Sequence, residues 1–156
     1  MMTLPQRPVS RRLVLAGLAM VAPSLLTARP AAAAASTLGF GELYGKVTPL
    51  GLQFSDKTKA LDGKSVSMRG FMAPPLKAEA AFFVLTEIPM SLCPFCSSDA
   101  DWPDNIVVVY LSARQTFTQA NQTIEVTGRL ETGSWTDPET GFVSLLRLRD
   151  AHYAPV

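Results

Sequence analysis

Residues 65–72 read Ser-Val-Ser-Met-Arg-Gly-Phe-Met, a stretch in which polar and apolar side chains alternate. Alternation with a period of two predicts a strand that buries one face and exposes the other. Two later stretches, Ala-Phe-Phe-Val-Leu at 81–85 and Ile-Val-Val-Val-Tyr-Leu at 106–111, are continuously apolar. Runs of this kind are typical of strands that are buried on both faces. Together the three stretches predict an all-β fold.

Two further strands complete the prediction. Residues 123–130 alternate again, and residues 142–150 form the last strand, while residues 112–121 link the third strand to the fourth and are expected to hold at most one short helix. Five strands with this spacing predict a small five- or six-stranded OB-like barrel, with a β-sandwich as the alternative. Gly70 and Gly128 follow valines near the ends of two strands, where glycine suits a barrel corner.

The last strand begins after a turn, Asp-Pro-Glu-Thr-Gly at 137–141. Its side chains divide between two faces. We expect Leu146 and Leu148, together with Ser144, on the face opposite Arg147 and Arg149. The apolar face of this strand is therefore predicted to help close the core.

The first 35 residues are predicted to be an export signal. Arg11 and Arg12 precede an apolar stretch, 13–26, and small residues at 31–35 offer cleavage sites near Ala33 to Ala35. This pattern is typical of a twin-arginine signal, with an ordinary secretory signal as the alternative. A transmembrane anchor is disfavoured, because the apolar stretch is shorter than the roughly 20 residues needed to span a bilayer. The remainder is predicted to work in the periplasm.

We therefore divide the chain into a signal at 1–35, an irregular N-terminal arm at 36–60 and an OB-like domain at 61–156. The signal contains four of the 14 Lys and Arg residues and none of the 13 Asp and Glu residues, so 10 basic residues face 13 acidic ones in the remainder, a net charge of −3. That charge argues against a nucleic-acid partner. No second apolar span follows, so no stable membrane anchor is expected after cleavage.

Both cysteines of the chain lie in one Cys-Pro-Phe-Cys motif, Cys93 to Cys96, between two apolar strands. Two thiolates at this spacing can share a soft metal ion, and Zn²⁺ or Cu(I) are the candidates. A closed zinc site needs two further ligands, which a homodimer could supply, whereas Cu(I) would accept the two thiolates with one thioether. The chain itself offers four additional candidate ligands: Met90, Asp99, Asp101 and His152.

Two other interpretations of the motif stay open. In one, Cys93 and Cys96 form a structural disulfide in a protein-interaction module, which closes a small loop and adds little stability. In the other they exchange disulfides, although the segment after Cys96 is a poor helix for stabilising a thiolate. Asp99, Asp101 and Asp104 could also hold a hard cation such as Ca²⁺. No other catalytic constellation is present, so the protein is not expected to be an enzyme unless it exchanges thiols.

The middle of the chain resembles a family of small exported bacterial proteins of unknown function. The resemblance covers roughly residues 60–130 and rests on Gly-Phe-Met-Ala-Pro at 70–74, on Cys93, and on Asn-Ile-Val-Val at 105–108. In the commonest version of the family, a His and several prolines follow the cysteine. Here Cys93 matches that cysteine, and Cys96 has no clear counterpart.

The resemblance implies a role as well as a fold. The family is associated with ABC-type export systems of the lipoprotein-release kind and with periplasmic metal handling. It therefore implies an accessory protein whose partner is a periplasmic or membrane protein, such as an ABC-transporter component. It names no reaction.

Overall fold

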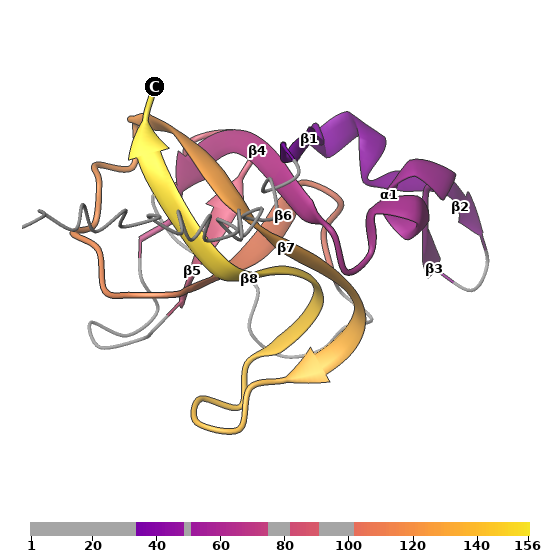
Figure 1. Ribbon diagram of the computed structural model, residues 1–156. Coiled ribbons are helices and arrows are strands. Elements are labelled where there is room, and N and C mark those ends of the chain that lie inside the picture. The colour runs from indigo at the N-terminus through magenta and orange to yellow at the C-terminus, as the bar shows by residue number, and fades with distance from the viewer. Residues whose placement is uncertain (1–33, 49–50, 75–81, 91–101) are drawn as a thin grey trace, which may run out of the picture. The chain divides into compact units, whose positions relative to one another are not determined.

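The protein is described by a computed structural model, which covers residues 34–48, 51–74, 82–90 and 102–156. Figure 1 shows an arrangement dominated by strands. The elements are, in chain order, β1 (Ser36–Thr37), the 3-10 helix η1 (Phe40–Glu42), β2 (Tyr44–Thr48), β3 (Gly51–Phe54), α1 (Asp56–Leu61), β4 (Ser65–Met72), β5 (Phe82–Thr86), β6 (Ile106–Leu111), β7 (Thr123–Thr136) and β8 (Val143–Pro155). The all-β prediction is confirmed.

Five strands pair in a cyclic order. β4 pairs antiparallel with β5, β5 with β6, and β6 runs parallel to β8. β8 pairs antiparallel with β7, and β7 pairs with β4 over seven residue pairs, which returns to the first strand. The β4–β5 contact is short, with only Phe71↔Thr86 and Met72↔Leu85 in register. This cyclic order fits an OB-like barrel with a short β4–β5 contact, and the all-β fold is also compatible with the β-sandwich alternative.

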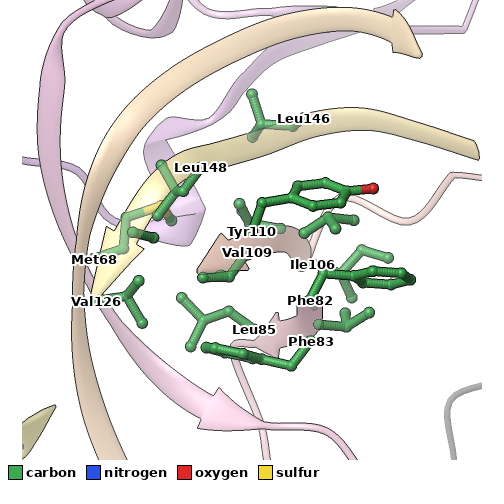
Figure 2. Packing of buried hydrophobic residues seen from close by; sticks show 14 of the residues in the cluster. Met68, Phe82, Phe83, Leu85, Ile106, Val109, Tyr110, Val126, Leu146 and Leu148 are labelled. Carbon is green, nitrogen blue, oxygen red and sulfur yellow. The ribbon is translucent and has the colours of Figure 1, made fainter. Parts of the chain in front are cut away.

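The core follows the predicted alternation. Met68, Leu85, Val109, Val126 and Leu148 come from five different strands, and Figure 2 shows them gathered on one interior. β5 is buried at every position and β6 at all but its last, as their apolar sequences predict. The core therefore holds the ends of β5 and β6 in place, and these ends carry the connection that contains the cysteines.

The last strand divides as its sequence predicts. Ser144, Leu146 and Leu148 are fully buried. Arg147 and Arg149 project to the other face, where they contact the Trp135 ring. β7 and β8 extend beyond the predicted 123–130 and 142–150, and Figure 1 shows them as long, curved ribbons.

Both predicted corner glycines lie where a side chain would collide with backbone. A Cβ on Gly70 would lie 2.6 Å from the carbonyl oxygen of Thr86, and one on Gly128 would lie 3.0 Å from that of Arg149. Opposite Gly128, β8 contains one extra residue between the pairs Thr127↔His152 and Arg129↔Arg149. Asp150 adopts a positive φ of 51° in this bulge, a conformation that Asp tolerates better than most residues.

The segment 36–60 is more ordered than the predicted irregular arm. β1 pairs with β4, β2 pairs with β3, and Leu38, Phe40 and Leu43 belong to the hydrophobic core. α1 begins after Ser55, whose hydroxyl accepts a hydrogen bond from the Thr58 N–H. Four glycines interrupt the apolar pattern of this segment, which is why the sequence does not predict its contribution to the core.

The segment between β6 and β7 contains no helix, so the one short helix considered for 112–121 does not form. Backbone and side-chain hydrogen bonds hold this segment against β8 instead. The Gln115 side chain both donates to the Tyr153 carbonyl and accepts from the Tyr153 N–H, at 3.1 Å each. Gln115 thus satisfies the two backbone groups of Tyr153 that face away from β7.

Candidate functional site

The connection between β5 and β6 carries the predicted metal motif. Cys93, Cys96, Asp99 and Asp101 lie outside the described residues. Met90, on the β5 side of the connection, is half-buried, and Asp104, on the β6 side, is exposed. Within the described part of the chain, no group of three or more His, Cys, Asp or Glu side chains could hold a metal ion.

His152 lies far from both ends of this connection. It follows Ala151, which pairs with Leu111 at the last residue of β6, whereas Asn105 precedes the first residue of that strand. The intervening strand is about 17 Å long at 3.3 Å per residue. The His152 side chain is exposed at that opposite end. The structure thus does not bring His152 to the stems of the cysteine connection.

Hydrogen bonds fix both stems. The Glu87 N–H donates to the Asn105 carbonyl at 3.1 Å, which joins the two stems directly. The fully buried Thr86 hydroxyl lies 2.7 Å from the Ile88 carbonyl and 3.2 Å from the Phe71 carbonyl. None of these groups belongs to the Cys-Pro-Phe-Cys motif, so the stems are held independently of it.

Trp102 anchors the β6 side a second time. Its side chain is buried, and its indole N–H donates a 2.9 Å hydrogen bond to the Tyr44 hydroxyl. The Tyr44 ring stacks on Phe54, with the ring centroids 5.4 Å apart. Burial raises the pKa of Tyr44, the Trp102 hydrogen bond lowers it, and Asp104 raises it, so the phenol stays neutral throughout the physiological range. No pattern in the sequence signals this pairing of Trp102 with Tyr44.

A cleft of about 150 Å³ opens beside the stems. Its walls are Phe40, Tyr44 and Leu52 from the N-terminal segment, and Glu87 and Asp104 from the two stems. Within the described residues, neither carboxylate forms a side-chain hydrogen bond or ion pair. The cleft beside the stems is therefore lined by two negatively charged carboxylates, which attract cations.

A second cluster occupies the outer face of β6, β7 and β8. Glu131 accepts hydrogen bonds from Arg129, Arg147 and Arg149, with N···O distances of 2.6, 3.0 and 3.3 Å. Partial burial acts to raise the pKa of Glu131, but the hydrogen bonds from Arg147 and Arg129 outweigh it and hold that pKa below its usual value. The sequence signal for this cluster was only the predicted outward placement of Arg147 and Arg149.

Aromatic rings pack against the same arginines. The Arg149 guanidinium carbon lies 4.0 Å from the Trp135 ring centroid and 4.2 Å from that of Tyr110. Trp135 and Tyr110 meet edge to face, with centroids 5.3 Å apart. Figure 2 shows the Tyr110 hydroxyl pointing away from the aliphatic core, where burial and the neighbouring Asp137 carboxylate raise the pKa of Tyr110. Trp135 belongs to β7.

The chain has little detectable similarity to known proteins. No family model matches the chain, and no curated protein matches it. Among the described residues, no helix is long and apolar enough to cross a membrane. One solved structure is similar, that of a DUF3299 family protein from Pseudomonas aeruginosa PAO1, with a TM-score of 0.48 and 17% sequence identity over 79% of this chain and 97% of that one.

Proposed function

We propose that this is an exported accessory protein that binds a thiophilic metal ion, Zn²⁺ or Cu(I), through Cys93 and Cys96. The observation that carries the proposal is that the Cys-x-x-Cys motif is inserted between two stems that are both held by the barrel. Two thiolates at this spacing suit a soft ion, and fixed stems reduce the conformational entropy that metal binding must overcome.

The charges beside the stems support the same proposal. Glu87 and Asp104 line the cleft at the base of the connection, and no described cation offsets them. A negative potential there increases the local concentration of cations and favours the thiolate-bound metal over the free ion. The partner that we propose for the loaded protein is a periplasmic or membrane protein, of the ABC-transporter type that the family resemblance implies.

The first experiment is a joint measurement of metal and thiols. The protein is purified under reducing, oxygen-free conditions, and metal content and reactive thiols are counted in the same sample. About one metal per chain or per dimer, with both thiols protected until a chelator is added, is the expected result. The Cys93→Ser and Cys96→Ser variants should each lose the metal, while Ser112→Ala should retain it.

Other results would replace metal binding with one of two disulfide roles for Cys93 and Cys96. If no metal is present and both thiols react freely, then close to a stable disulfide in air, the metal proposal fails. A disulfide that resists the glutathione pool would then indicate a structural bridge in a protein-interaction module. One that glutathione reduces readily would instead indicate thiol–disulfide exchange.

A further inference from the structure

We propose that Arg149, packed against Trp135 and Tyr110, is the centre of a surface that binds a carboxylate group from an acidic segment of a partner protein. We call the residues Arg129, Trp135, Arg147 and Arg149 the arginine surface. It lies on the outer face of β7 and β8 and shares no described residue with the cysteine connection. The proposal therefore stands or falls independently of metal binding.

The Arg149 guanidinium is held in one orientation. The rings of Trp135 and Tyr110 contact it at 4.0 and 4.2 Å, and its Nε donates to Glu131 at 3.3 Å. Its two Nη amino groups form no hydrogen bond within the part of the chain that the structure describes. A guanidinium that is stacked on aromatic rings and bonded only through Nε presents its remaining donors as a fixed fork, which matches the two oxygens of a carboxylate.

The charges of the arginine surface favour a ligand that carries one negative charge. Among the ion-paired groups, Arg129, Arg147 and Arg149 contribute three positive charges, and Glu131 and Asp150 compensate two of them. Asp137 lies beside the Tyr110 hydroxyl but forms no ion pair with these arginines among the described residues. One positive charge is therefore left within the ion-paired group, in a chain whose part after residue 35 is net negative. A single carboxylate neutralises that charge, whereas a doubly charged phosphate would exceed it beside Glu131 and Asp150.

The composition of the surface is that of a protein-binding site. Trp, Tyr and Arg are the residues that contribute most binding energy at protein interfaces. The Arg149 side chain is 24% exposed and that of Arg129 46% exposed, so both can be reached from solvent. Arg147 is nearly buried and donates a hydrogen bond to the Gly133 carbonyl at 2.8 Å. This bond holds the Arg147 guanidinium against the Trp135 ring. A rigid, partly exposed arginine beside a tryptophan is suited to an acidic side chain of a partner.

The test uses a fluorescein-labelled tetraglutamate peptide as the probe, with tetraglutamine as the uncharged control. We expect the protein to bind tetraglutamate and not tetraglutamine, with an affinity that falls as salt is added. Arg149→Gln should weaken tetraglutamate binding about tenfold or more, because it removes charge-assisted hydrogen bonds. Arg114→Gln, at an exposed arginine outside the surface, should change the affinity less than twofold, as is usual for a distant exposed charge.

Arg129→Gln keeps the test informative if Arg149→Gln does not fold. Arg129 is more exposed, and its loss should weaken binding roughly two- to fivefold. Inorganic phosphate is the competitor that identifies the anion. The proposal is overturned if tetraglutamate does not bind, if Arg114→Gln weakens binding as much as the surface variants do, or if phosphate competes more tightly than the peptide binds.

Discussion

The indole N–H of Trp102 donates a 2.9 Å hydrogen bond to the hydroxyl of Tyr44, which ties the start of β6 to the N-terminal segment. The two residues are 58 positions apart, and Tyr44 also lines the cleft beside the stems. Both rings are largely withdrawn from water. If the bond is lost, water therefore cannot fully replace it, and the loss costs free energy. This hydrogen bond thus connects the N-terminal segment to the β6 end of the cysteine connection.

Tyr44→Phe should destabilise the protein by about 1–3 kcal/mol, because it leaves the buried Trp102 N–H without an acceptor. Urea unfolding measures the change. Tyr110→Phe is the comparison, since its buried hydroxyl meets no group at hydrogen-bonding distance among the described residues and interacts only electrostatically with Asp137. Its removal should cost clearly less than that of the Tyr44 hydroxyl. Equal losses in the two variants would show that the Trp102 bond contributes nothing specific.

Gly70→Ala should be strongly destabilising. Its Cβ would lie 2.6 Å from the Thr86 carbonyl oxygen, and backbone cannot move aside as a flexible side chain can. Overpacking of this kind costs about 1–3 kcal/mol. Gly41→Ala is the control, because a Cβ there meets nothing within 4 Å. Thermal unfolding should separate the two variants by several degrees, and indistinguishable melting temperatures would contradict the close approach at the barrel corner.

The barrel strands could be predicted from the sequence because each carries its own periodic signal. β4 and β6 have the bounds that alternation and apolar runs indicated, and the two faces of β8 divide as expected. The Trp102–Tyr44 contact has no such signal, since it joins two segments that pair only in the folded chain. The same holds for Phe40, which enters the core from a glycine-interrupted stretch.

The candidate site was less predictable than the fold. A Cys-x-x-Cys motif specifies two ligands by spacing alone, but the remaining ligands of a metal come from residues brought together by the fold. His152 was a candidate because of its residue type, and the structure puts it beyond the far end of β6. The arginine cluster around Glu131 arises from three residues on two strands, and only the strand pairing brings them together.

Metal binding should depend on the cysteines and not on His152. With Zn²⁺ present at about a hundred times its dissociation constant, the protein should gain about 2.7 kcal/mol of stability. The Cys93→Ser, Cys96→Ser double variant should lose that gain, whereas His152→Ala should keep it because of the distance along β6. Thermal unfolding with and without metal measures both. Loss of the gain in His152→Ala would show that the cysteine connection extends along the barrel to that residue.

Glu131→Gln should destabilise the protein at neutral pH and flatten its acid sensitivity. Three arginines share this carboxylate, and Arg147 is nearly buried, so about 1.5–3 kcal/mol of charge-assisted hydrogen bonding is lost. The pKa of Glu131 is held below its ordinary value of 4.5, so its contribution is complete above that pH and disappears as the pH falls through the lowered pKa. Urea midpoints of the native protein should therefore fall more steeply below pH 4.5 than those of Glu131→Gln. Glu139→Gln, at an exposed carboxylate, should follow the native profile, and parallel acid profiles for all three proteins would refute the shared role of Glu131.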